Sequence, residues 1–297
     1  MSAPTAPRGR RAVDQRLIDL HDAYTHGDID RRVFVDRLAA LVGGVAAGLA
    51  LIRLVAAEPA AAAMVAADDP RLETGMIPAA ASGGVIATYV AKPKDAHELP
   101  AVVVIHENRG LNAHIQDVAR RLALEGFLAL APDFLSPLGG TPEDQDKARE
   151  MIGELDGEAT VANAVAVADA ARGHADGNGK AGAVGFCWGG ALANSLAIAD
   201  PLLGAAVVYY GRQPDPQLVP TIKAPLLLHY AGLDERINAG VAPYEEALKA
   251  NGKTYTIHVY EGVNHAFNND TSSARYDEAA ATLAWSRTVA FLKQYLA

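Results

Sequence analysis

The sequence contains a single cysteine among its 297 residues. With one thiol, the chain can form neither a disulfide within itself nor a zinc site built from several cysteines. Cys187 is therefore either a small buried apolar residue or a reactive thiol. Basic residues are also few: 26 Lys and Arg stand against 35 Asp and Glu, which gives a net charge of −9. This balance excludes the basic surface of a nucleic-acid-binding protein.

Residues 1–75 differ from the rest because strand-like alternation is absent from them. Leu17, Leu20 and Tyr24 recur at helical spacing, and this pattern predicts a short amphipathic helix that ends before Gly27. An uncharged run and an Ala-rich stretch follow it. We therefore expect a helical, partly hydrophobic extension over residues 1–75 and one main domain over residues 76–297.

The extension has two interpretations. Arg31 and Arg32, an uncharged run over residues 38–52 and small residues at 65–67 are typical of a twin-arginine export signal. Alternatively, the extension is a helical arm that packs on the main domain or on a second subunit, which would permit a homodimer. Both locations, cytoplasmic and exported, stay open. Membrane contact through residues 38–52 is disfavoured, because their 15 residues are fewer than the roughly 20 of a membrane span.

From residue 76 onward, short β-branched runs alternate with segments of helical periodicity. Such an alternation predicts an α/β fold with a mostly parallel sheet and helices on both faces. We expect strands at residues 85–90, 101–105, 127–131, 181–185, 205–209, 225–230 and 254–260. We expect helices near residues 115–122, 142–153, 158–172, 188–199, 240–250 and 275–296.

The cysteine lies between a predicted strand and a predicted helix, in the sequence Gly185-Phe186-Cys187-Trp188-Gly189. This is the pattern of a nucleophile elbow with Cys in place of Ser, and no G-x-S-x-G occurs elsewhere in the chain. Glycines two residues either side permit the strained tight turn. The N-terminus of the following helix favours a thiolate. The pattern therefore predicts that Cys187 is a nucleophile.

Two further residues complete the order nucleophile, acid, histidine that α/β-hydrolases use. Asp234 follows a predicted strand at its carboxyl end, where parallel sheets expose their active-site groups. Glu235 competes with it as the acid. His265 lies between the last strand and the last helix. His229 and His258 fall within strands, so we expect packing roles for them.

Together with the segment His106-Glu107-Asn108-Arg109-Gly110, these motifs resemble the dienelactone hydrolase (carboxymethylenebutenolidase) family of α/β-hydrolases. The resemblance implies a Cys187–His265–Asp234 triad and an oxyanion hole formed by the backbone N–H groups of Trp188 and Asn108. It also implies that the Glu107 carboxylate contacts the resting thiol until substrate displaces it. No cofactor and no metal are implied.

The family's two carboxylate-binding arginines are replaced here by Pro137 and Asn269, which argues against dienelactone as the natural substrate. Arg109, Arg212 and Arg236 are candidates for substitutes. The resemblance implies hydrolysis of a small ester or lactone by acyl transfer. Two alternatives are a thiol redox protein that uses Cys187 and a non-catalytic protein whose extension binds a partner or a membrane.

Overall fold

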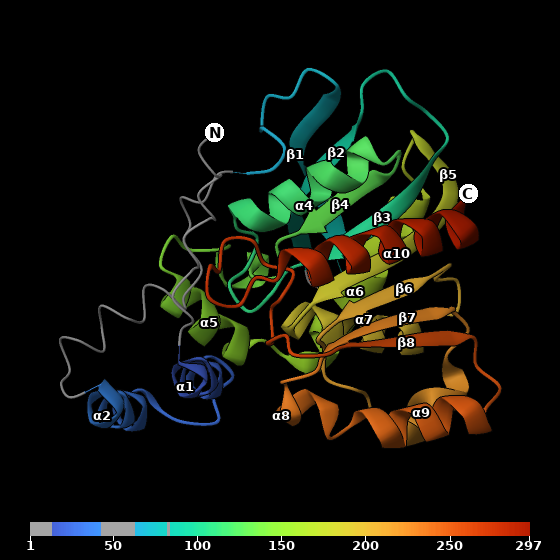
Figure 1. The fold of residues 1–297 in the computed structure, drawn as a ribbon. Helices are drawn as coiled ribbons and strands as arrows, with labels where there is room; N and C mark the ends of the chain where they lie inside the picture. The colour runs from blue at the N-terminus through green and yellow to red at the C-terminus, as the bar shows by residue number, and fades with distance from the viewer. Residues whose placement is uncertain (1–13, 43–62, 82–83) are drawn as a thin grey trace, which may run out of the picture.

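A computed structural model describes residues 14–42, 63–81 and 84–297. Its centre is an eight-stranded sheet of order β1-β2-β4-β3-β5-β6-β7-β8 (Figure 1). Strand β2 runs antiparallel to β1 and β4, and all other neighbours are parallel. The strands are β1 Leu72–Ala81, β2 Gly84–Pro93, β3 Leu99–Ile105, β4 Leu128–Pro132, β5 Gly177–Phe186, β6 Ala206–Tyr209, β7 Leu226–Ala231 and β8 Tyr255–Tyr260.

Helices cover both faces of the sheet, so the predicted α/β architecture is confirmed. Apolar residues of α4 and α10 pack on one face, and those of α6, α7 and α9 pack on the other. The helices of the main domain are α4 Ala113–Leu124, α5 Gln145–Glu154, α6 Gly157–Arg172, α7 Trp188–Ala199, α8 Glu235–Asn238, α9 Val241–Ala250 and α10 Glu278–Leu296. Two short 3-10 helices, η1 Ser136–Leu138 and η2 Pro216–Thr221, lie in the loops.

Strand β1 is the one element of the sheet that the sequence did not predict. It begins at Leu72, inside the segment that we expected to contain no strand. It pairs antiparallel with β2, the next strand along the chain. Gly75 and Pro78 interrupt its apolar pattern. Proline is tolerated here because β1 lies at the edge of the sheet, where one side of the strand needs no ladder hydrogen bonds.

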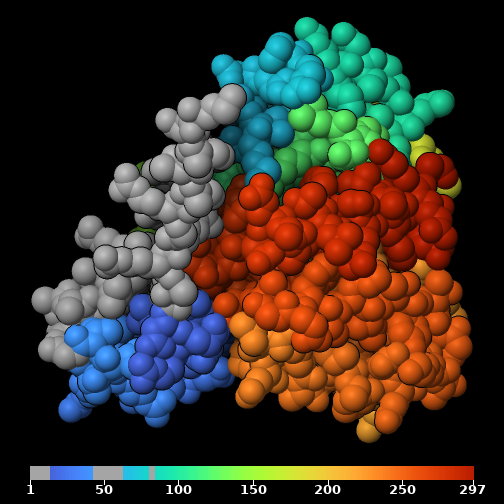
Figure 2. Space-filling model, in the orientation of Figure 1, coloured from blue at the N-terminus to red at the C-terminus, as the bar shows by residue number. Residues whose placement is uncertain are grey.

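Helices α1 (Gln15–Thr25) and α2 (Arg31–Val42) form an arm beside the main domain (Figures 1 and 2). The predicted amphipathic helix is α1, and Gly27 follows it with φ +82°. The two helices share a small core in which the rings of Tyr24 and Phe34 stack with their centroids 4.4 Å apart. We call the segment Gln15–Val42 the arm.

The paired arginines Arg31 and Arg32 begin α2. Most of the uncharged run at 38–52 lies outside the described residues, so the export signal stays a prediction. Among the described residues, no helix combines the length and hydropathy that a membrane span requires. Val65, within the small-residue stretch, is buried, and its N–H donates to the Asp117 carboxylate at 2.8 Å.

Candidate active site

Cys187 lies in the sharp turn between β5 and α7 with φ +55°, a backbone conformation that L-residues rarely adopt. Glycine is required on both sides. A Cβ at Gly185 would lie 2.0 Å from the Gly189 carbonyl oxygen, and a Cβ at Gly189 would lie 2.4 Å from that of His106. The clashes are with backbone rather than with the cysteine side chain. The strained elbow predicted from the sequence is therefore present.

His265 and Asp234 meet at the carboxyl edge of the sheet, beyond β8 and β7. The Nδ1–H of His265 donates to Oδ2 of Asp234 at 2.5 Å, and both side chains are buried. The other carboxylate oxygen of Asp234 accepts from the Ile237 N–H and caps α8. Glu235 is exposed. The carboxylate that contacts the histidine is therefore that of Asp234.

The thiol and imidazole form a polarised pair. Burial alone would raise the pKa of the Cys187 thiol, but the nearby charge of His265, with His26, outweighs burial and lowers the pKa to about 6. Burial likewise disfavours the charged form of His265, yet the charge of Cys187 and the hydrogen bond to Asp234 raise its pKa to about 10. At neutral pH the pair is a thiolate and an imidazolium.

We expect the alkylation rate of Cys187 by iodoacetamide, measured with a metal chelator present, to titrate with a midpoint near its pKa of about 6. The thiolate exists above this pKa, so the rate should rise through the midpoint and stay flat at higher pH. The chain unfolded in urea should titrate near pH ~8.5. Any thiol alkylation measured must be that of Cys187, because it is the only cysteine in the sequence. A folded-state rate that follows the unfolded titration would contradict the lowered pKa.

Glu107 lies two residues beyond β3, and its carboxylate bonds to other groups than the thiol that the resemblance implies. One carboxylate oxygen accepts from the Tyr210 hydroxyl at 3.3 Å, and the other accepts from the side-chain N–H of Asn269 at 2.7 Å. These two donors hold the carboxylate, while the thiol contacts His26 instead. Asn269 drew attention in the sequence only because it replaces one of the family's arginines. In the structure it fixes the Glu107 carboxylate together with Tyr210.

Trp188 and Asn108 flank the thiol at the positions predicted for an oxyanion hole. Trp188 begins α7, where backbone N–H groups lack partners within the helix. Its indole stacks on the His106 ring with centroids 5.2 Å apart. The side chain of Asn108 donates to the Thr25 carbonyl of the arm at 2.8 Å. In the described part of the chain, neither backbone N–H is used in a hydrogen bond.

A cavity of about 430 Å³ opens beside Cys187 and is lined by residues of the arm and of the main domain. Arg212 and Arg236, two of the three candidate substitutes for the family's arginines, line it. Arg109 does not line this cavity: its guanidinium donates to the Gln145 carbonyl at 2.7 Å. Arg149 does line the cavity, although the sequence had not indicated this residue as a candidate for substrate binding. Three guanidinium groups and one carboxylate, that of Glu150, therefore line this cavity, so positive charge predominates on its wall.

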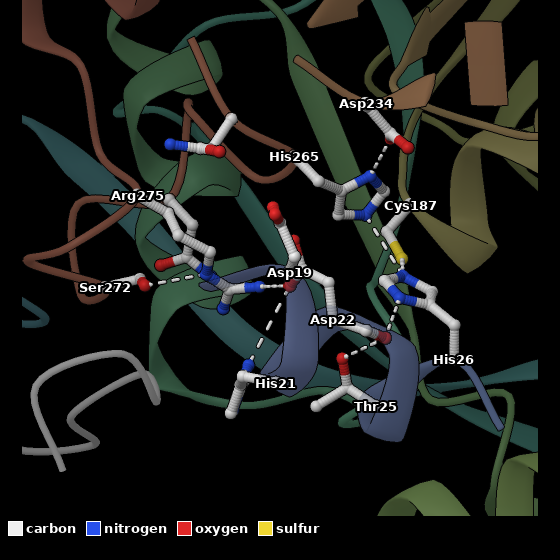
Figure 3. A network of polar contacts seen from close by, with 12 residues as sticks. Asp19, His21, Asp22, Thr25, His26, Cys187, Asp234, His265, Ser272 and Arg275 are labelled. Carbon is white, nitrogen blue, oxygen red and sulfur yellow. Dashed lines mark hydrogen bonds and ion pairs between the residues drawn. The ribbon is translucent and has the colours of Figure 1, made fainter. Parts of the chain in front are cut away.

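The sequence also gave no sign of His26, which reaches the reactive thiol from the arm (Figure 3). Its Nε2 lies 3.3 Å from the Cys187 sulfur and 3.2 Å from Nε2 of His265. The sequence signal at this position is only the end of a helix before Gly27. A helix end does not indicate which part of the fold its last residue will meet.

His229 has the packing role that we expected. It is fully buried, with one ring nitrogen 3.1 Å from the Thr288 hydroxyl and the other 3.0 Å from that of Tyr260. His258 lies on the neighbouring strand, and its ring stacks on that of His229. Neither histidine lines the cavity beside Cys187.

Comparison with known proteins identifies the fold and the family. A family model described as the dienelactone hydrolase family matches residues 86–296. A second model, described as YqhI-like, matches residues 7–43, which include α1 and α2. A crystal structure of a provisionally named dienelactone hydrolase from Klebsiella pneumoniae is 32% identical with a TM-score of 0.69, and the match covers 75% of this chain and 99% of that one.

Two proteins provisionally named carboxymethylenebutenolidase are similar over most of the chain. The protein of Escherichia coli O157:H7 is 34% identical over 257 residues, which cover 81% of this chain and 94% of that one. The protein of Methylorubrum extorquens is 32% identical over 278 residues, which cover 88% of this chain and 94% of that one. With the matched domain and the α/β-hydrolase sheet described above, the chain belongs to the dienelactone hydrolase family of hydrolases.

Proposed function

We propose that the protein hydrolyses an ester or lactone by acyl transfer to Cys187, with His265 as acid and base and Asp234 as the orienting group. The observation that carries this proposal is the 2.5 Å hydrogen bond between His265 and Asp234 beside the only thiol of the chain. Family membership favours hydrolysis over a redox role. The lack of a second cysteine to resolve an oxidised sulfur favours it too.

In the first step the Cys187 thiolate attacks the carbonyl carbon of the substrate, and a carbon–sulfur bond forms as the carbonyl oxygen becomes an oxyanion. The backbone N–H groups of Trp188 and Asn108 donate to that oxyanion. Each such donor is typically worth about 10²–10³ in rate. Collapse of the intermediate breaks the carbon–oxygen bond, and the leaving alkoxide takes the Nε2 proton of His265. The product is a thioester on Cys187.

In the second step the neutral His265 takes a proton from water at Nε2, and the resulting hydroxide attacks the thioester carbon. The carbon–sulfur bond breaks, the acid leaves, and the thiolate and imidazolium are restored. Asp234 keeps the histidine proton on Nδ1 throughout, so that Nε2 alone exchanges protons with the reacting atoms. Both steps therefore use the same nitrogen.

The cavity wall favours a substrate that carries an anionic group. Arg149, Arg212 and Arg236 all line the cavity beside the thiol. Arg149 is partly occupied by the arm, because it donates to the Tyr24 carbonyl at 2.9 Å. Arg212 is exposed and Arg236 is partly so. The family's own arginine positions hold Pro137 and Asn269 in this chain. Arg212 and Arg236 would therefore bind the anionic group from a different part of the cavity wall, which suits a lactone or ester of different shape.

The test is to trap the acyl-enzyme. We expect the protein mixed with p-nitrophenyl acetate and quenched in acid to gain one acetyl group, located by peptide mass spectrometry on the peptide that contains Cys187. Release of p-nitrophenol should show a burst of about one equivalent if thioester hydrolysis is the slower step. Steady turnover with the acetyl group on another residue would overturn the assignment of the nucleophile.

A further inference from the structure

We propose that His26, Cys187 and His265 form a binding site for one divalent metal ion of the zinc class, which the arm completes. One donor atom from each residue lies within 4.8 Å of the other two. A sulfur and two imidazole nitrogens are the donor set that favours zinc over magnesium or calcium. From the sequence we expected no metal, since the resemblance implied none; the single cysteine by itself excluded only sites made of several cysteines.

The spacing of the donors suits a tetrahedral ion. Zinc binds nitrogen at roughly 2.0–2.1 Å and thiolate at about 2.3 Å, so its ligands lie about 3.3–3.6 Å from one another. In the structure Nε2 of His26 is 3.2 Å from Nε2 of His265 and 3.3 Å from the Cys187 sulfur. The two His26 distances are therefore within a few tenths of an ångström of the spacing that coordination requires, and the Cys187 sulfur and the His265 donor lie within 4.8 Å of one another.

Hydrogen bonds on the far side of each ring direct the Nε2 lone pairs toward the sulfur. Nδ1 of His26 lies 2.7 Å from the Asp22 carbonyl oxygen, which can only accept, so this nitrogen carries the proton. Nδ1 of His265 donates to the Asp234 carboxylate. Carbonyl and carboxylate partners of this kind are the ones that metal-bound histidines have.

Without a metal, Nε2 of His265 carries the imidazolium proton, and the atoms that can accept it are Nε2 of His26, 3.2 Å away, and the Cys187 thiolate. A metal ion that binds here takes the place of that proton. A single proton can join two of the three donors. A metal ion satisfies all three, and its fourth position can face the cavity, which both His26 and Cys187 line.

The arm holds His26 in this position through contacts on both sides. The Thr25 carbonyl accepts from the Asn108 side chain at 2.8 Å, and Arg275 donates to the Asp22 carboxylate at 2.9 Å (Figure 3). Arg149 donates to the Tyr24 hydroxyl at 2.8 Å, and its guanidinium lies over the ring of that tyrosine. The third ligand is therefore preorganised by the fold, which reduces the cost of binding.

Metal binding would occupy the sulfur and the His265 nitrogen that acyl transfer needs. The metal-loaded protein should therefore be inactive toward esters, and a chelator should restore activity. This consequence rests on the proposed function, whereas the binding itself does not.

The test uses Co²⁺ as a spectroscopic probe on the full chain, freed of metal with a chelator that is then removed. We expect one Co²⁺ per chain, a thiolate-to-cobalt charge-transfer band, the intense visible bands of a tetrahedral ion, and displacement by Zn²⁺. Cys187→Ala should lose the charge-transfer band. His26→Ala should weaken binding about 100-fold or more, since loss of a ligand costs at least as much as loss of its hydrogen-bonding partner.

Two measurements separate a ligand from a structural residue. Added imidazole should restore the cobalt bands of His26→Ala, which it would not do if the substitution merely displaced the arm. His97→Ala, a change at an exposed histidine, should bind Co²⁺ as the unmodified protein does. Equal affinity of His26→Ala and the unmodified protein, or the absence of a charge-transfer band in the latter, would overturn the site. Neither readout requires esterase activity.

Discussion

Replacing Cys187 with alanine is expected to reduce the hydrolysis of p-nitrophenyl acetate about 10⁴-fold or more, to the background rate. The loss is large because no second nucleophile of the elbow type exists in the chain. His265 and the N–H groups of the elbow would remain, but they would act on a substrate with no sulfur to attack it. Initial rates at saturating substrate, with chelator present, measure the effect.

The control for this variant is Ser195→Ala, a similar truncation on the same helix. The Ser195 hydroxyl bonds back to the Ala191 carbonyl at 3.2 Å. We expect the control to keep its rate within about twofold, because the half-buried Ser195 hydroxyl bonds within its own helix and Ser195 does not line the cavity beside Cys187. Circular dichroism should show both variants folded. Cys187→Ala with more than about a tenth of the original rate would show that another group attacks the ester.

Replacing Asp234 with asparagine is expected to lower kcat about 10⁴-fold. The asparagine side chain can still cap α8, so the local fold should persist. Its amide, however, can donate to Nδ1 of His265 and thereby move the histidine proton to Nε2. The imidazole would then lack the free nitrogen that the second step needs, and the imidazolium would lose its buried carboxylate partner.

Glu235 provides the matched control, because the sequence alone left it as a competitor for this role. Its side chain is exposed, while that of Asp234 is buried against His265. We expect Glu235→Gln to keep kcat within about twofold. A large loss in Glu235→Gln together with a small one in Asp234→Asn would exchange their roles. Steady-state kinetics of both variants at one pH is sufficient to decide.

Predictions from local pattern were accurate where local chemistry decides the structure. The buried strand at 101–105 is a continuous β-branched run, and it became β3. The Gly-x-Cys-x-Gly segment became the elbow, because only glycine avoids the backbone at those two positions. Strand β1 was missed for the opposite reason: Gly75 and Pro78 obscure its pattern, and its pairing with β2 is what defines it.

The partners of the catalytic groups were not accessible to such reasoning. Glu107 was expected on the thiol, yet Asn269 and Tyr210, more than 100 residues away in the chain, hold its carboxylate elsewhere. His26 contacts a sulfur 161 residues further along the sequence. Contacts between such distant segments depend on how whole elements pack, and no local signal records them.

The sequence by itself determined the α/β fold class, the position of the cysteine at a strand–helix turn, and the order of acid and histidine after it. These features follow from hydrophobic periodicity and from the steric demands of glycine, which act over a few residues. Only the tertiary structure decided that Asp234 rather than Glu235 meets His265, and that the arm brings His26 to the thiol. Those outcomes depend on burial and on long-range packing, which bring together groups that are far apart in the chain.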